Sequence, residues 1–315
     1  MKEIIRYDVS FSETEQKILT GKLIAKADMF LKIVYLTSNG KIISHEQRIP
    51  ISQILDMEGI SDNTVCGTSF TLTDCRTVLS NDAKSFTYEI TVDVEASGYS
   101  TCKYILCDDA FSDKAEINCK KYSFKNCCFS KIAKEQSFRE TFTLGLYDKL
   151  HDISAIPSIL TTDYDKDSEL LTVSGTFSCK ALYTDENGEF ASAEKEIPFI
   201  LKIQTDGKAD RIETSTDMTL KSFAYIENDS TSAELRIDCT YKGFLFTFND
   251  VTVVAEAAIG ETYTTSDNNK IILYYAEENE AVWDISKKYK KDPQHLMKIN
   301  GLTEDVLKKP TMMRL

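Results

Sequence analysis

Three histidines, His45, His151 and His295, are the first candidates for catalytic chemistry in this 315-residue chain. Acid–base catalysis by histidine needs a nucleophile or a second acid within hydrogen-bond reach, and the sequence suggests none for any of the three. The zinc-protease pattern HExxH, the hydrolase pattern GxSxG and glycine-rich phosphate loops are also missing. We therefore expect no enzymatic activity and no cofactor, with His45 and His295 at exposed positions.

A metal site is the second chemical possibility. Nine cysteines occur, two of them adjacent as Cys127-Cys128, but their spacings match no common zinc pattern. We expect reduced thiols, most of them buried on strands. His151-Asp152 and the acids of residues 163–167 offer ligands for a cation, although a solvated acidic loop is the more common meaning of such a run. We expect no bound metal.

The elements that would position any site are β-strands, and one arrangement of them occurs twice. Apolar residues alternate at period two over residues 29–35, Asn39-Gly40 follows, and an Ile-Pro step ends the next run. Alternation predicts a half-buried strand, and Asn-Gly between two such runs predicts a hairpin with a type I′ turn. The pattern returns with Asn187-Gly188, at a constant offset of 148 residues for turn, alternation and Ile-Pro step. We interpret this as a duplicated β-module.

Further strands are expected around the first hairpin. Residues 65–79 are rich in Thr and Val, and residues 86–94 alternate, which predicts two strands. Residues 99–107 predict a last strand. In the second module, the proline and acids of residues 148–167 predict a surface loop instead.

These elements predict a mainly β protein of two antiparallel, sandwich-like modules followed by a small βααβ domain. The modules are expected at residues 1–134 and 135–258. Small and polar residues at 259–270 predict a linker, which leaves residues 271–315 for the last domain.

That last domain has helical periodicity between two short strands. Apolar residues recur at helical spacing over residues 282–289, with Asn279 as a candidate N-cap. Pro293 predicts the start of a second helix, since proline is favoured at the first helical position. Asn300-Gly301 predicts its end, because both residues accept the left-handed conformation.

This domain resembles a LysM domain. The matching residues are Tyr275, the run Val282-Trp283-Asp284-Ile285-Ser286-Lys287-Lys288-Tyr289, Leu296, the run Ile299-Asn300-Gly301-Leu302 and Leu315. The family's Gly-Asp-Thr before the first helix is here Asn279-Glu280-Ala281, and its Gly-Gln before the last strand is Pro310-Thr311. In LysM domains these loops form the glycan groove, so the resemblance implies affinity for glycan containing N-acetylglucosamine.

The duplicated module is similar to the SPOCS domain of spore-forming Firmicutes, through its Asn-Gly turn, charged strand and Ile-Pro step. Two such modules followed by LysM look like spore-coat and cortex morphogenetic proteins of clostridia. The resemblance implies a non-enzymatic scaffold that helps assemble the layers around a forespore and works in the mother-cell cytoplasm.

Two groups of residues are candidates for binding. Adjacent loops at one end of the last domain are expected to bind a glycan or a partner, with helix-ending chemistry as an equal alternative for Asn300-Gly301. The first helix is expected to carry a basic face that docks an acidic partner or a second copy. The loop group is Asn279, Glu280, Ala281, Asn300, Gly301 and Leu302, and the basic docking face is Lys287, Lys288 and Lys291.

Trp283, the only tryptophan, is expected either to stack on a ligand or, more in keeping with its helix, to pack partly into the core. The net charge of −13 argues against nucleic acid and anionic membranes as partners. No apolar stretch is long enough to span a bilayer, and no secretory signal is visible at the start. We therefore expect a protein partner in spore envelope assembly, with a peptidoglycan-binding role as the alternative.

Overall fold

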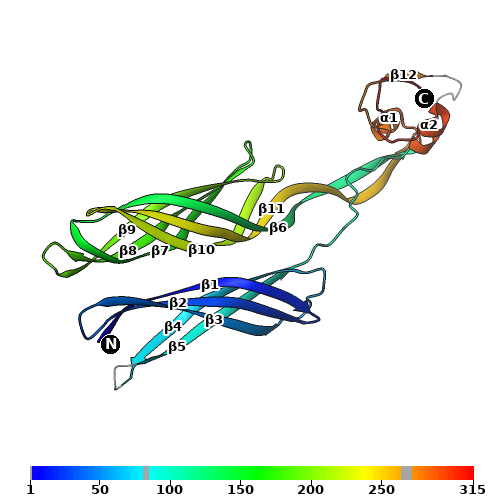
Figure 1. Ribbon diagram of the computed structural model, residues 1–315. Coiled ribbons are helices and arrows are strands. Elements are labelled where there is room, and N and C mark those ends of the chain that lie inside the picture. Colours follow the sequence, from blue (N-terminus) through cyan, green and yellow to red (C-terminus); the bar gives the residue numbers. More distant parts are fainter. Residues whose placement is uncertain (1, 81–84, 264–271) are drawn as a thin grey trace. The chain divides into compact units, whose positions relative to one another are not determined.

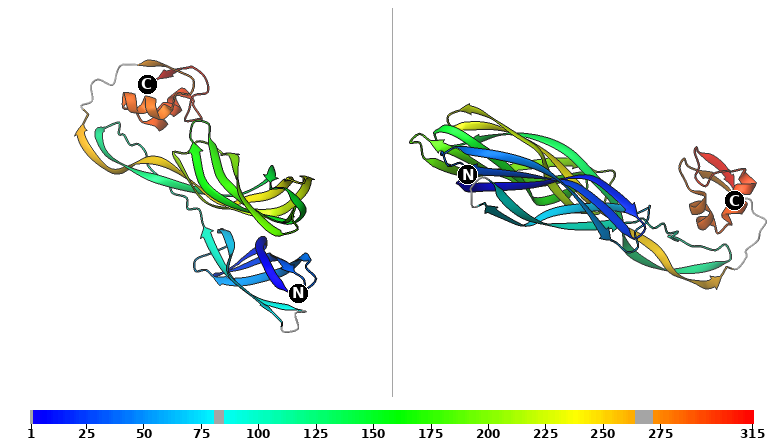
Figure 2. Two further views of the ribbon diagram at one scale, coloured as in Figure 1. Left: turned by 90° about the vertical axis from the view of Figure 1, so that its left-hand side faces the viewer. Right: turned by 60° about the horizontal axis from the view of Figure 1, so that its bottom comes forward.

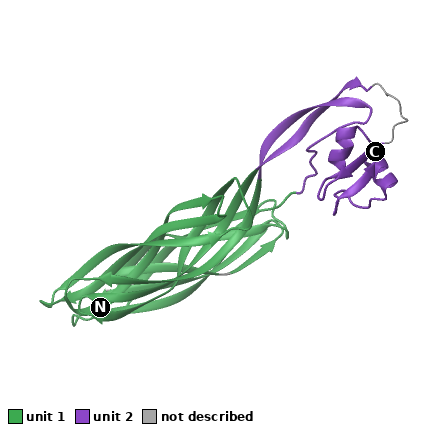
Figure 3. Cartoon of the chain, turned by 90° about the horizontal axis from the view of Figure 1, so that it is seen from above, with its two compact units in different colours: residues 1–102, 127–249 green, residues 103–126, 250–315 purple. Residues whose placement is uncertain are grey.

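The computed structural model describes residues 2–80, 85–263 and 272–315. The described residues are mainly β-strand in several antiparallel sheets, with helices α1 and α2 near the C-terminus, which confirms the predicted fold class at that level (Figure 1). The chain forms two compact units, each made of two segments (Figure 3). Unit 1 comprises Met1–Cys102 and Cys127–Asn249, and unit 2 comprises Lys103–Asn126 and Asp250–Leu315.

The first sheet is a three-stranded meander around the predicted hairpin. It has the order β1-β2-β3, from β1 (Glu3–Leu19), β2 (Lys22–Leu36) and β3 (Ile42–Asp56). The hairpin is confirmed, but its turn is not type I′. The Gly40 N–H donates to the Thr37 carbonyl at 3.0 Å. Gly40 has a φ of +80°, whereas Asn39 has a negative φ, so the glycine alone takes the left-handed conformation.

A second meander in unit 1 repeats this register. Lys32 of β2 pairs with Glu46 of β3, and Lys180 pairs with Glu194 in the second meander. Its turn repeats as well, since the Gly188 N–H donates to the Asp185 carbonyl at 3.1 Å. The sheet has the order β7-β8-β9, from β7 (Tyr147–Asp165), β8 (Leu170–Asp185) and β9 (Phe190–Gln204).

Strand β7 corrects the surface loop predicted at residues 148–167. Pro157 and the acids favoured a loop, but Ile153 and Ala155 are buried, so the segment has one apolar face. Pro157 is tolerated because β7 is an outer strand of its sheet, where a missing N–H costs no ladder hydrogen bond. The Ile-Pro steps follow the same rule, since Pro50 and Pro198 lie on the outer strands β3 and β9.

Two further sheets complete the strands of the modules. β4 pairs with β5, and the other sheet has the order β10-β11-β6. β5 ends at Tyr99, and residues 100–107 have no regular structure, so the last strand predicted at 99–107 is wrong. β6 runs from unit 2 into unit 1, and β11 runs from unit 1 into unit 2 (Figure 3). The strands are β4 (Val65–Leu79), β5 (Phe86–Tyr99), β6 (Ala115–Thr143), β10 (Arg211–Asp229) and β11 (Ser232–Thr262).

The predicted domain limits fall inside these strands. The limit between residues 134 and 135 lies within β6, and the limit after residue 258 lies within β11. β11 continues to Thr262, so the first residues of the predicted linker at 259–270 are strand. Residues 264–270 of that linker, and position 271, lie outside the described residues.

The largest core is formed by buried side chains from both sheets of the second module, β7-β8-β9 and β10-β11-β6, whose strands Figure 2 shows from two further sides. Phe177 and Cys179 of β8 share it with Leu235, Ile237 and Tyr241 of β11, and all five side chains are fully buried. In the first module, β2 supplies most of the buried residues, among them Leu23, Leu31 and Ile33.

A buried charge cluster joins the two meanders within unit 1. Asp152 of β7 is only 4% exposed. Its carboxylate accepts hydrogen bonds from Lys32 Nζ at 2.6 Å and from the Arg6 guanidinium. Because Arg6 and Lys32 belong to β1 and β2, this single acid connects the first sheet to the second.

The C-terminal residues form the predicted strand-helix-helix-strand order. Leu273–Ala276 (β12) pairs with Thr311–Arg314 (β13), and between them lie α1 (Val282–Tyr289) and α2 (Pro293–Asn300). A small core holds these elements together, and we call residues 272–315 the C-terminal module. Its buried residues are Ala276, Val282, Ile285, Leu296, Leu307, Met313 and Leu315.

The caps of α2 are as predicted, whereas the N-cap of α1 is not. Pro293 is at the start of α2, and Gly301 ends it with a φ of +63°. The N-cap of α1 is Ala281, without a side-chain hydrogen bond, and Asn279 lies two residues earlier with a φ of +67°. Neither helix in the described part of the chain is long and apolar enough to cross a membrane.

Candidate functional site

Helix α1 carries one face into the core and presents the other to the rest of unit 2. Val282 and Ile285 are buried in the C-terminal module. Trp283 and Lys287 are four residues apart, so they lie on the same side of the helix, away from those apolar positions. The helix ends at Lys290, whose left-handed conformation (φ 54°) turns the chain toward α2.

Trp283 lies outside the core and contacts the segment that precedes β6. Its side chain is 40% exposed, and its indole Nε1–H donates to Asp109 Oδ2 at 3.1 Å. Its ring packs edge-to-face against Phe111, with 4.7 Å between centroids and an interplanar angle of 74°. This geometry is favourable for aromatic pairs because the ring edge meets the electron-rich ring face. Trp283 therefore makes an edge-to-face contact with Phe111 instead of the expected partial packing into the core.

Lys287 completes the environment of the same carboxylate. Its Nζ lies 2.7 Å from Asp109 Oδ1 and 2.6 Å from Oδ2. The hydrogen bonds from Lys287 and, second, from Trp283 hold the pKa of Asp109 below its usual value. Asp109 is thus a carboxylate held between an ammonium group and an indole N–H, with an aromatic ring two residues later.

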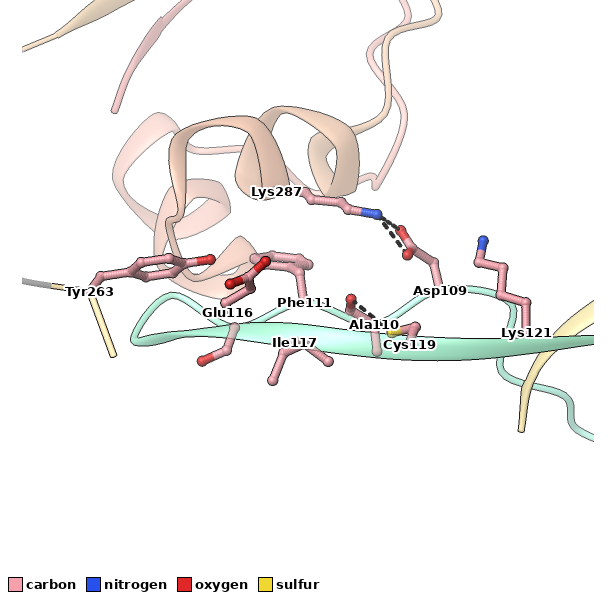
Figure 4. A pocket seen from close by; sticks show the side chains of 10 residues that line it. Asp109, Ala110, Phe111, Glu116, Ile117, Cys119, Lys121, Tyr263 and Lys287 are labelled. Carbon is pink, nitrogen blue, oxygen red and sulfur yellow. Dashed lines mark hydrogen bonds and ion pairs between the residues drawn. The ribbon is translucent and has the colours of Figure 1, made fainter. Parts of the chain in front are cut away.

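The segment that carries Asp109 and Phe111 has no regular secondary structure. The Val254 N–H of β11 donates to the Cys107 carbonyl of this segment at 2.7 Å, and the Tyr263 N–H donates to the Lys114 carbonyl at 2.8 Å. Next to it, Lys290 Nζ lies 3.4 Å from the ring centroid of Tyr263. A cavity of about 290 Å³ lies beside these contacts, and Figure 4 shows Asp109, Phe111, Glu116, Tyr263 and Lys287 around it.

The predicted loop residues ahead of α1 are held by internal hydrogen bonds. The Asn279 N–H donates to the Leu307 carbonyl at 2.7 Å, and Ala281 forms a β-bridge with Val306. The Glu280 carboxylate accepts from the Tyr274 hydroxyl at 2.7 Å and from the Glu277 N–H at 3.0 Å. The hydrogen bond from Glu280 is the main reason that the pKa of Tyr274 is raised to about 12.

The predicted residues at the end of α2 are held by contacts to β13 and to the core of the C-terminal module. Asn300 Nδ2 donates to the carbonyls of Leu296 and Arg314, both at 2.8 Å, and its Oδ1 accepts from the Arg314 N–H at 2.7 Å. Gly301 caps the helix, and Leu302 packs against the core. Asn300 therefore joins α2 to β13, which agrees with the structural alternative for this residue.

The three lysines of the predicted basic docking face have different surroundings. Lys287 is bound to Asp109, as above. Lys288 Nζ lies 5.1 Å from the ring centroid of Tyr274 and 5.5 Å from that of Tyr289. Lys291 is partly buried, and its N–H donates to the Ser286 carbonyl at 2.9 Å. The structure thus brings one of the three, Lys287, to the Trp283 contact.

The predicted acidic run at residues 163–167 covers the end of β7 and the start of the turn to β8. Asp165 accepts hydrogen bonds from the Asp167 N–H at 3.0 Å and the Ser168 hydroxyl at 2.7 Å, which lowers its pKa. His45 and His295 are exposed, as expected. His151 Nε2 lies 2.7 Å from Thr184 Oγ1 at the end of the β7–β8 pair.

Comparison with known proteins gives one match. Residues 1–80 match the family model of the SipL SPOCS domain, which covers β1 to β4. Neither the search of curated proteins nor the search of solved structures returned a match.

Proposed function

We propose that this protein is a non-enzymatic scaffold in endospore envelope assembly and that its C-terminal module, a LysM-like domain, docks a protein partner. The match of residues 1–80 to a SPOCS domain supports a role in sporulation. The second meander shares the register and turn of the first, which supports a duplicated SPOCS module. The order β12-α1-α2-β13 supports the LysM likeness.

One observation carries the docking role. The Trp283–Lys287 side of α1 already binds a piece of polypeptide, through an ion pair, an indole hydrogen bond and an aromatic contact. Tryptophan is among the residues that are enriched at protein–protein interfaces and that contribute most to their binding energy. The loop residues that a glycan would need, Glu280 and Asn300, spend their side-chain polar atoms on internal hydrogen bonds. We therefore favour a protein partner over peptidoglycan.

The working place we propose is the mother-cell cytoplasm, at the forespore surface. No nucleic acid is part of the proposal, since a chain of net charge −13 repels phosphate backbones. A fluorescent fusion of the full chain should form a ring around the forespore in sporulating cells. Diffuse fluorescence, or fluorescence at the cell wall, would contradict this location.

Capture experiments separate the two functions. The full chain, Lys287→Glu and the control Lys308→Glu are each incubated with lysate of sporulating cells and, separately, with insoluble peptidoglycan. Lys308 is the matched control because it is an exposed lysine of the same module, paired only with Glu304 at 2.6 Å among the contacts found. We expect capture of a defined protein that Lys287→Glu abolishes and Lys308→Glu preserves. Sedimentation with peptidoglycan, unaffected by Lys287→Glu, would favour the glycan-binding alternative instead.

A further inference from the structure

The side of α1 formed by Trp283 and Lys287 contacts another segment of the same chain. That segment is the tripeptide Asp109-Ala110-Phe111. The carboxylate of this tripeptide accepts from Lys287 and Trp283, and its phenyl ring meets the indole at 4.7 Å between centroids. Residues two apart in the tripeptide thus contact residues four apart in the helix.

We propose that this surface recognises an acidic-aromatic motif, Asp-x-aromatic, in a partner protein and that the chain's own copy of the motif competes for it. The proposal rests on the docking role proposed above and specifies the surface and the chemistry of the partner. The recognition elements are a fixed cation, a fixed N–H donor and a ring face, so the motif must carry its carboxylate and its ring at the same spacing.

The contact within the chain is suited to exchange. The segment that bears the motif lacks regular structure, and neither Asp109 nor Phe111 belongs to the core of the C-terminal module. The ion pair is solvent-accessible, with the Lys287 side chain 47% exposed, and accessible pairs of this kind are individually weak. Just before the motif, Tyr104, Ile105 and Leu106 expose 77%, 105% and 49% of their surface, so the segment is not anchored there by burial.

Charge and shape favour a peptide over other occupants. The Asp109 carboxylate binds the Lys287 ammonium nearly symmetrically, since Lys287 Nζ lies 2.7 Å from Oδ1 and 2.6 Å from Oδ2. An aromatic side chain two residues later then meets the indole ring in an edge-to-face contact. A motif with Asn in place of Asp would lose the ion pair, and one with Ala in place of the ring would lose the aromatic contact.

Trp283 is the only tryptophan, so its fluorescence reports on this site directly. The double variant Asp109→Asn/Phe111→Ala in the full chain should expose the indole and shift its emission to longer wavelength. A synthetic peptide of residues 108–113, Asp-Asp-Ala-Phe-Ser-Asp, should then reverse the shift in a saturable way. The wild-type chain should bind the same peptide at least about tenfold more weakly, because its site is occupied.

Controls connect the signal to the motif and the helix. A peptide with the Asp109→Asn and Phe111→Ala changes should leave the emission unchanged. In the emptied double variant, adding Lys287→Met should abolish peptide binding, whereas Lys308→Met should preserve it. Circular dichroism verifies that each variant keeps its strands and helices.

Three results would overturn the proposal. One is an emission spectrum that is identical in the wild type and the double variant. Another is no saturable response to the peptide in the double variant. A wild-type dimer that Asp109→Asn/Phe111→Ala dissolves would identify a second copy as the occupant and exclude a separate partner. If peptide binding fails while Lys287→Glu still abolishes capture from lysate, only the motif is wrong; if capture itself fails, the docking role is wrong.

Discussion

Replacing Asp152 by Asn should weaken the contact between the two meanders more than a substitution at the surface of unit 1 does. Asp152 lies on β7 with its side chain 6% exposed, and it accepts from Lys32 and Arg6, whose side chains are 25% and 15% exposed. The amide keeps the size of the carboxylate but removes its charge. Two buried cations then lose their shared counter-ion.

The cost follows from the number and burial of the bonds lost. A hydrogen bond to a charged group contributes about 1.5–3 kcal/mol, and two such bonds end at Asp152. Removal of one partner of a buried pair costs about 3–5 kcal/mol, but both cations here keep some contact with water. We therefore expect Asp152→Asn to destabilise the contact between the meanders by about 3 kcal/mol, and Lys32→Met by about half of that.

The second meander supplies a matched control. Lys180 stands at the position of Lys32 in the repeated register, pairs with Glu194 at 2.8 Å, and has a side chain that is 46% exposed. A surface pair of this kind contributes roughly 0–1 kcal/mol, so Lys180→Met should be nearly neutral. The two lysines differ in burial and in their contact with Asp152, while strand position is the same.

Hydrogen exchange measured by mass spectrometry can localise the effect, because peptides from β1, β2 and β7 report on the contact separately from the C-terminal module. Asp152→Asn should speed exchange in all three strands, and Lys32→Met should do so more than Lys180→Met. The reasoning would be refuted if Lys32→Met and Lys180→Met changed hydrogen exchange equally. It would also be refuted if the opening free energy of these strands in Asp152→Asn stayed within about 1 kcal/mol of the wild-type value.

Three further outcomes are expected. Burial raises the pKa of Asp8, so the folded state holds that proton more tightly than the unfolded state does, and stability falls as pH rises through the raised pKa. In urea unfolding, the free energy of unfolding of Asp8→Asn should therefore equal that of the wild type at about pH 3 and exceed it at about pH 7. Gly175→Ala should lower the free energy of unfolding by about 1–3 kcal/mol, because a Cβ there would lie 2.2 Å from a backbone oxygen that no rotamer change can move; an unchanged urea midpoint would contradict this. Cys179 and Cys239 are fully buried, with pKa values of about 12, so a thiol reagent should label exposed Cys102 first and leave those two unlabelled until unfolding.

The strands were predictable from the sequence wherever one face is buried and the other is exposed to solvent. Residues 29–33 on β2 alternate in sequence and in burial, although Val34 beyond them is also buried, and residues 88–94 on β5 alternate between partly buried and exposed positions. β7 escaped prediction because its composition, with Pro157 and many acids, is typical of loops. Composition says nothing of sheet order, and it is the outer position of β7 that makes Pro157 acceptable.

Only the helical half of the candidate site was predictable from the sequence. The existence of α1 and the exposure of Lys287 follow from local sequence, as do the ends of α2 at Pro293 and Gly301, whereas the N-cap of α1 does not. Its partner Asp109 lies 178 residues away in a segment without periodicity, and no local rule connects the two. Asn300 shows the opposite case, since its helix-ending type was visible but its hydrogen bonds to Arg314 depend on how β13 returns to the helix.

The prolines on the outer strands have a consequence for the layer assembly proposed above. An outer strand with free N–H and C=O groups can be extended by any passing chain, which leads to uncontrolled stacking. Pro50, Pro157 and Pro198, three of the five prolines, each remove a donor from such a border. In the layer proposed above, these three borders would then be less open to pairing with strands of neighbouring copies than the outer strands without proline, such as β1 and β10.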